Sequence, residues 1–164
     1  MFNLRMTMKL HGHLRVPAIS TDVIEPATTR LGDWYANLLV HHRRKVVLFA
    51  SELTLLPVLI AAPAIATLIP RFGDALAKLL VAIGVDEPDA RAELGEMESV
   101  SFARTANRRV LGSMSDFAWL LDGAPADETL FNAAIRLADA PCSPIGWATP
   151  RSATVALFAS KSAR

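Results

Sequence analysis

Residues 53–70 form a long apolar stretch that prolines interrupt. Its 18 residues just reach the minimum length of a membrane-spanning helix. However, Pro57 and Pro63 each remove a backbone hydrogen-bond donor inside it, which disfavours a continuous helix. Glu52 and Arg71 flank the stretch closely, and no aromatic belt marks its ends. The segment therefore indicates a buried strand, a turn and the start of a packed helix, and no membrane association.

Size and composition indicate a single domain that spans residues 1–164. A chain of 164 residues buries enough surface to fold without a disulfide or a metal ion. Its 52% apolar and 20% charged residues exclude a disordered protein, and its net charge of +1 gives no global attraction to nucleic acid. The single cysteine, Cys142, excludes an internal disulfide, and the N-terminus lacks the apolar core of a secretory signal. We therefore expect a cytoplasmic protein.

Period-two alternation and short apolar runs predict a sheet. Phe2, Leu4 and Met6 alternate with polar residues, as in a half-buried strand. Pro57 favours either an edge position or a bulge for a later strand, because proline cannot donate to a strand ladder. The expected strands are residues 2–7, 34–40, 46–50, 55–60 and 100–103, of which the second and third form a hairpin.

Helical periodicity and capping residues predict the other elements. Residues 9–14 suit either a short helix or a continuation of the first strand, and residues 17–30 are expected to form a surface loop. Pro70 is expected to begin a helix that ends at Gly84. The helices that follow are expected to begin at Asp86, Asn107, Asp127 and Thr149. Together these elements predict an α+β domain, a mainly antiparallel sheet of four or five strands with helices packed on one face.

Most of the polar chemistry lies at the start of the helix that Asn107 is expected to cap. The free N–H groups and the dipole at that end favour an anion, and Arg108 and Arg109 add positive charge. Ser113 and Asp116 are three residues apart, so they share a helix face and are able to bond to each other or to a ligand. A purely structural alternative stays open, in which Asn107 only caps and the arginines are solvated or pair with glutamates.

Alternation on the first hairpin strand predicts that Trp34 lies on one face and that Tyr35 and Asn37 lie on the other. A core tryptophan with a surface tyrosine is one interpretation. The other makes Tyr35 and Asn37 the polar wall of a pocket.

Residues 41–45 place five potentially cationic side chains at the expected hairpin tip. Such a cluster suits either the phosphates of a nucleic acid or a solvated turn. The histidines, including His11 and His13, match no metal-site spacing, so we predict no metal site. The sequence also lacks phosphate-loop, dinucleotide-binding, hydrolase-elbow, zinc-protease and C-x-x-C motifs, and we predict no cofactor.

Three blocks, in the same order along the chain, resemble a prokaryotic family of domains of unknown function. Residues 31–39 read LGDWYANLL, residues 102–116 contain NRRVLGSMSD, and residues 137–146 contain PCSP. The family has no assigned activity, so the resemblance implies one α+β domain with a polar helix start and no particular reaction. Two departures concern this site. Arg109 and Ser115 replace the serine and the asparagine of the usual N-R-S-V-L-G-S-M-N-D block, and the usual C-T-K-K-L of the first strand reads MTMKL here.

The first functional hypothesis is the binding of an anionic ligand, a nucleotide or an RNA segment, at the Asn107 helix start. Arg108 and Arg109 would supply charge, and Asp116 would orient one of them. The other expected ligand-binding residues are Asn107, Asn37, Ser113 and, as outer steering charges, Lys9 and Lys45.

Two further hypotheses stay open, and with them the question whether the protein is an enzyme. One is phosphodiester cleavage or phosphoryl transfer at the same site, with Asp116 as the base. The other is a protein-interaction module, antitoxin-like or an accessory partner, that uses the apolar surface of residues 53–70. Nothing in the sequence favours a particular oligomeric state.

Overall fold

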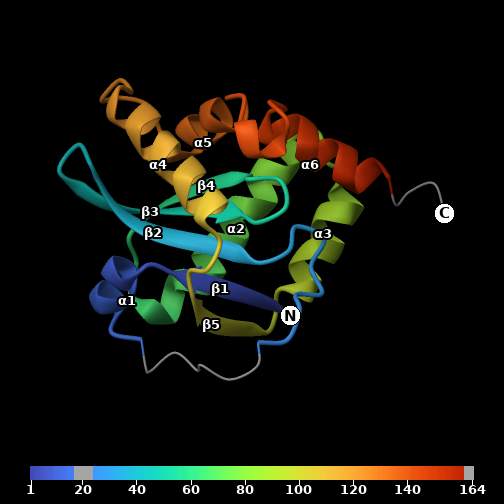
Figure 1. Cartoon of the computed structure of the whole chain (residues 1–164), viewed down its shortest axis with the longest axis horizontal. Coiled ribbons are helices and arrows are strands. Elements are labelled where there is room, and N and C mark those ends of the chain that lie inside the picture. Colours follow the sequence, from blue (N-terminus) through green and yellow to red (C-terminus); the bar gives the residue numbers. More distant parts are fainter. Residues whose placement is uncertain (17–23, 161–164) are drawn as a thin grey trace.

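A computed structural model describes residues 1–16 and 24–160 of the chain. Five strands form one sheet in the spatial order β4-β3-β2-β1-β5 (Figure 1). The strands are β1 (Phe2–Met6), β2 (Trp34–His41), β3 (Arg44–Ser51), β4 (Pro57–Ala61) and β5 (Val100–Arg104). The five predicted strands are therefore confirmed, as is the edge position of the strand that contains Pro57.

The sheet is mixed, because β1 pairs in parallel with both of its neighbours while β2, β3 and β4 pair antiparallel. The expectation of a mainly antiparallel sheet was wrong. Two helices carry the chain from β4 at one edge to β5 at the other, and a long helical crossover permits parallel pairing. Periodicity reports which residues face the core, but it carries no information on strand direction.

Seven helical segments pack around the sheet in the described parts of the chain. They are α1 (Met8–Leu14), α2 (Ile65–Ile83), α3 (Glu87–Glu96), α4 (Arg108–Asp122), α5 (Leu130–Ala138), the short 3₁₀ helix η1 (Ser143–Ile145) and α6 (Pro150–Ala159). In Figure 1, α4 crosses in front of the sheet and α2 lies behind it. Helices therefore pack on both faces, and the expectation of one covered face was wrong. The continuous apolar run of β3, buried from Val46 to Ser51, is the sequence feature that reports burial on both sides.

The core behind the sheet is built around Phe72 of α2. Its ring stacks on Phe49 at a centroid distance of 4.2 Å and meets the edge of Trp34 at 4.9 Å. The ring of Phe2 lies 6.2 Å from that of Phe72, so Phe72 lies against aromatic side chains of three adjacent strands, β1, β2 and β3. Trp34 therefore faces α2, and the predicted separation of Trp34 from Tyr35 is confirmed.

Two helices begin at residues other than those expected. α2 begins at Ile65 and contains Pro70, because Leu68 extends the buried stripe of the helix by one turn toward the N-terminus. α5 is capped by Thr129 and not by Asp127, since the Thr129 side chain accepts a hydrogen bond from the Asn132 N–H. The predicted stop of α2 at Gly84 is confirmed by a φ of 105°, a conformation that favours glycine.

The connections also agree with the sequence where the structure describes them. His42 and Arg43 turn the hairpin with φ of 45° and 64°, which is the backbone of a tight two-residue turn without its usual asparagine and glycine. The open alternative for residues 9–14 resolves as helix α1. In the predicted loop, residues 17–23 lie outside the described residues, and residues 24–30 contain no helix or strand. Among the described residues, no helix is long and apolar enough to cross a membrane.

Replacing Phe72 by alanine should lower the free energy of unfolding by about 3–5 kcal/mol, because the cavity would open between α2 and three aromatic side chains. Val81, half exposed on the same helix, is the matched control, and Val81→Ala should change stability by less than about 0.5 kcal/mol. Urea denaturation followed by circular dichroism measures both. Equal losses in the two variants would contradict this description of the core.

Candidate functional site

Asn107 holds the start of α4 through hydrogen bonds of both its side chain and its backbone. Its Oδ1 accepts a hydrogen bond from the Arg109 N–H at 3.0 Å, which confirms the predicted N-cap. Its backbone N–H donates to the Tyr35 hydroxyl oxygen at 3.1 Å, and its Nδ2 donates weakly to Glu52 Oε1 at 3.4 Å. These contacts tie the start of α4 to β2 and to the turn that follows β3.

The Tyr35 side chain connects the sheet to this cluster. It is buried, and its hydroxyl lies 3.5 Å from Glu52 Oε1. Burial and the negative charge of Glu52 raise the pKa of Tyr35, while the nearby Arg5 opposes the shift. Tyr35 therefore stays neutral at physiological pH and is able both to accept from Asn107 and to donate toward Glu52.

A small hollow of about 130 Å³ lies beside the start of α4. The Arg109 guanidinium is held at its wall, where Nη2 donates to the Pro144 carbonyl oxygen at 3.0 Å. The hollow is lined by Glu52, Leu53, Leu55, Asn107, Arg109, Val110, Pro144 and Ile145. One carboxylate and one guanidinium thus share a small concave surface, which suits a ligand that carries both an acidic group and a hydrogen-bond donor.

Arg5 of β1 is a polar residue of this region that the sequence analysis missed. Its Nε donates to Asp33 Oδ2 at 2.7 Å, and its Nη1 donates to the Arg104 carbonyl oxygen at 3.2 Å. In the strand register, Arg5 lies beside Tyr35 on β2 and Ala103 on β5. The alternation that identified β1 as a strand already placed Arg5 on its polar face, but only the strand pairing brings it next to Tyr35.

Three of the predicted ligand-binding residues lie away from the hollow. Asn37 shares a face of β2 with Tyr35, but its Oδ1 accepts a hydrogen bond from the Thr7 hydroxyl at 2.8 Å. Lys9 is exposed on α1. Lys45 is exposed near the hairpin tip, and its pairing with Val40 puts it on the opposite face from Tyr35. None of these three residues lines the hollow.

The remaining predicted residues all lie on α4. Arg108 is exposed and makes no ion pair within the described part of the chain. The Ser113 hydroxyl donates to the Arg109 carbonyl oxygen one turn back, at 3.2 Å, and not to Asp116. Asp116 is exposed, and its charge adds to burial in raising the pKa of the Cys142 thiol. Since Asp116 does not line the hollow, the carboxylate that reaches it is Glu52.

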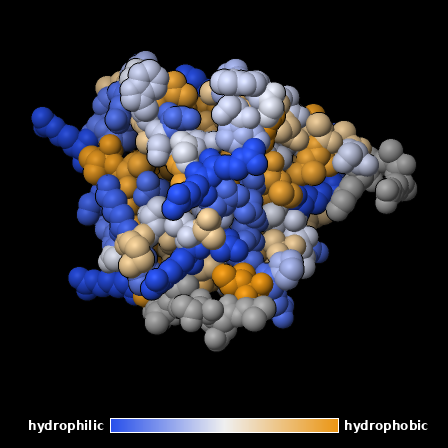
Figure 2. Space-filling model, viewed as in Figure 1, coloured by the Kyte–Doolittle hydropathy of each residue, from blue (hydrophilic) through white to orange (hydrophobic). Residues whose placement is uncertain are grey.

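Figure 2 shows the face of the molecule that carries the start of α4. Hydrophilic side chains gather over this region and in front of β1, between two areas of more hydrophobic surface. The exposed arginines of this segment of the chain are Arg104, Arg108 and Arg109. Among residues 1–16 and 24–160, no group of three histidine, cysteine or carboxylate side chains is arranged to hold a metal ion.

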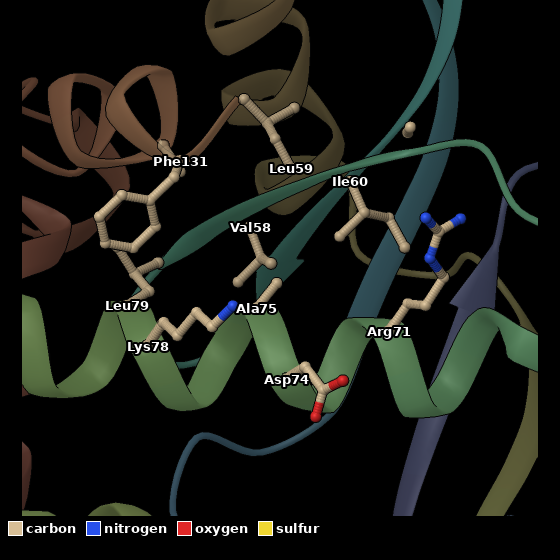
Figure 3. Close-up of a pocket in the computed structure, with 11 residues that line it drawn as sticks. Val58, Leu59, Ile60, Arg71, Asp74, Ala75, Lys78, Leu79 and Phe131 are labelled. Atoms are coloured by element: carbon tan, nitrogen blue, oxygen red, sulfur yellow. The ribbon is translucent and has the colours of Figure 1, made fainter. Parts of the chain in front are cut away.

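A larger hollow lies elsewhere, in a groove of about 510 Å³ along β4 between α2 and α5. Figure 3 shows Phe131 reaching from α5 toward Leu79 of α2, with Val58 of β4 between the two helices. Three charged residues of α2, Arg71, Asp74 and Lys78, line its rim. The groove therefore includes part of the apolar segment 53–70 that the sequence analysis singled out.

Tyr35 is the only tyrosine of the chain, so its ionisation is a direct probe of the cluster. Ultraviolet difference absorbance should show a titration midpoint above 10.0, because burial and Glu52 both disfavour the phenolate. Glu52→Gln should lower the midpoint, whereas Glu98→Gln, an exposed carboxylate after α3, should leave it unchanged. Because the pKa is raised in the folded state, stability should fall as the pH rises past 10.0. A titration midpoint that is the same in Glu52→Gln as in the wild type would contradict the contact between Tyr35 and Glu52.

Comparison with known proteins identifies one family. Residues 3–153 match the family described as Domain of unknown function (DUF6933). No curated protein and no solved structure matches the chain. The match covers most of the chain and includes every residue that lines the hollow beside α4. The chain therefore belongs to the DUF6933 family of domains of unknown function.

Proposed function

We propose that this protein binds a small anionic ligand of the nucleotide class at the start of α4. The observation that carries the proposal is that Asn107, Arg109 and Glu52 line one hollow at a helix N-terminus. Within the described residues, the N–H groups of Arg108 and Val110 have no hydrogen-bond acceptor. Free N–H groups and the helix dipole favour a phosphate or carboxylate at this point.

Glu52 makes the proposed ligand more specific than a simple anion. Its carboxylate would repel a second negative charge, but it accepts hydrogen bonds readily from a hydroxyl or amino group. A nucleotide carries both a phosphate and such donors. The hollow of about 130 Å³ is too small for a whole nucleotide, so the rest of the ligand would lie on the neighbouring polar surface near Arg108. A base stacked there and a phosphate at the helix start would use both parts of the site.

Thermal denaturation in the presence of nucleoside monophosphates and short RNAs tests the proposal. A ligand present at 100 times its dissociation constant should stabilise the protein by about 2.7 kcal/mol. Arg109→Gln should weaken binding by about tenfold or more, because it removes a charged donor from the hollow. Arg71→Gln, at an exposed arginine on α2, is the control and should bind as wild type.

Two results would overturn the proposal. One is the absence of stabilisation by every nucleotide and RNA in a protein that unfolds cooperatively. The other is equal weakening by Arg109→Gln and Arg71→Gln, which would reduce the effect to general electrostatic attraction. Glu52→Gln separates the parts of the site. This variant should weaken the binding of a nucleotide more than the binding of inorganic phosphate, because inorganic phosphate has no base or sugar donor for Glu52.

A second candidate function, protein interaction, is favoured by the groove along β4. Among the described residues β4 pairs with β3 alone, so its other edge has no strand neighbour. The Ala62 N–H donates to the Lys45 carbonyl oxygen, and the alternation of an antiparallel ladder then directs the N–H and C=O groups of Leu59 and Ala61 away from β3. Both residues line the groove. An extended peptide segment that adds a strand to this edge is the occupant that suits it.

Ala61→Pro tests this candidate, because it removes the outward N–H while leaving the ladder with β3 intact. Peptides selected from a random library on the wild-type protein should bind Ala61→Pro at least about tenfold more weakly. Arg109→Gln, far from β4 in the sequence and absent from the groove, should bind the same peptides normally. Peptides that bind Ala61→Pro as well as wild type, or no selected peptides at all, would contradict strand addition.

A further inference from the structure

A separate hollow of about 380 Å³ lies between the tip of the β2–β3 hairpin and the start of α5. His41 and Arg44 face each other across the two strands at this end of the sheet. His41 is six residues beyond Tyr35, which corresponds to about 20 Å along β2. The hollow is lined by His41, His42, Arg44, Val46, Ala61, Ala126, Glu128, Thr129 and Leu130, and it shares no residue with the hollow beside α4.

His41 is the observation that points to a ligand here. Only 7% of the residue is exposed, and no side-chain hydrogen bond between described residues involves its imidazole. Its ring lies beside that of His42, at a ring-centroid distance of 4.1 Å. The His41 ring nitrogens are not among the fully buried atoms that lack a partner, so solvent reaches them, and His41 lines the hollow. Their hydrogen-bonding capacity is therefore open to a ligand in the hollow.

The N-terminus of α5 faces the same hollow. Thr129 caps the helix by accepting a hydrogen bond from the Asn132 N–H at 3.1 Å. Among the described residues, the N–H groups of Leu130 and Phe131 have no acceptor. The nine-residue helix therefore presents free donors and a positive dipole end to the space beside His41.

Two fully charged side chains, Arg44 and Glu128, line the hollow, and only one of them has an ion-pair partner among the described residues. Glu128 is committed to a two-pronged ion pair with Arg136, with Nε–Oε1 at 2.8 Å and Nη2–Oε2 at 2.9 Å. This pairing lowers the pKa of Glu128 and neutralises its charge locally. Arg44 makes no ion pair within the described residues. Asp122, at the end of α4, does not line the hollow, but its negative charge favours the protonated form of His41 and so acts to raise its pKa.

We propose that this hollow binds the phosphate group of a small organic phosphate monoester. The guanidinium of Arg44, the imidazoles of His41 and His42 and the free N–H groups of α5 would surround the phosphate oxygens. Val46, Ala61, Ala126 and Leu130 give the hollow an apolar wall, and its volume exceeds what a phosphate alone requires. That wall is where the organic part of the ligand packs.

The ionisation of His41 supplies a local readout. Burial lowers its pKa first, and His42 and Arg136 act in the same direction, while Asp122 and Glu128 oppose them. His41 is therefore a neutral donor or acceptor in the free protein at physiological pH. A bound dianion would stabilise the imidazolium, so the pKa of His41 should rise on binding.

The test is to titrate the protein with phenyl phosphate and, separately, with inorganic phosphate. Calorimetry measures the affinity, and NMR records the ring signals of the histidines. Phenyl phosphate should bind more tightly than inorganic phosphate and should raise the pKa of His41, with the signal assigned from His41→Gln. Arg44→Gln should weaken binding about tenfold, because it removes a charged donor. Arg43→Gln is the matched control, since this exposed neighbour does not line the hollow. It should change the affinity by less than about twofold.

Arg109→Gln separates this site from the one beside α4, because it should leave phenyl phosphate binding at His41 unchanged. The proposal is overturned if Arg43→Gln and Arg44→Gln weaken binding equally, or if the His41 signals do not respond to saturating phenyl phosphate. Equal affinities for phenyl phosphate and inorganic phosphate would overturn the assignment of a monoester. Loss of binding in Arg109→Gln alone would place the phosphate at the start of α4 and also overturn the proposal.

Discussion

The pairing of β1 on both of its sides joins the two parts of the sheet and sets where the helices begin. β1 runs parallel to β2 on one side and to β5 on the other. Because parallel strands end at the same edge of a sheet, the chain leaves β1 and β5 at one edge, where α1 and α4 begin. Without β1, the hairpin unit β2–β3–β4 and the strand β5 would have no common sheet. The position of the α4 start thus follows from the first strand of the chain.

The same strand separates the core from the candidate site. Phe2 faces Phe72 of α2 on the apolar side, whereas Asn3 and Arg5 bind Asp33 on the polar side. Tyr35 then links that polar side to α4 through the backbone N–H of Asn107. Because this hydrogen bond holds the helix start, the donors of α4 and the carboxylate of Glu52 stay in fixed relation to each other. A ligand would meet a preorganised surface, which lowers the entropic cost of binding.

Local features of the fold could be predicted from the sequence, while features that depend on distant parts of the chain could not. The Asn107 cap and the Gly84 stop each depend on one residue and its helix, and both were predicted correctly. The mixed pairing was missed, because alternation has no direction. Helix α2 begins before Pro70 because tertiary packing of Leu68 outweighs the local preference of proline for a first turn. In the site, Glu52 was missed because it joins Asn107 only through the folding of β3 against β2.

The most direct test of the central claim, that the start of α4 is a binding surface built on β1 and β2, is amide chemical-shift mapping with a saturating nucleoside monophosphate. We expect the largest shifts at residues 107–110, with smaller ones at Tyr35 and Glu52, whose side chains contact Asn107. Chemical-shift changes confined to β4 or to the hairpin tip, with the amide signals of residues 107–110 unchanged, would contradict a binding surface at the start of α4.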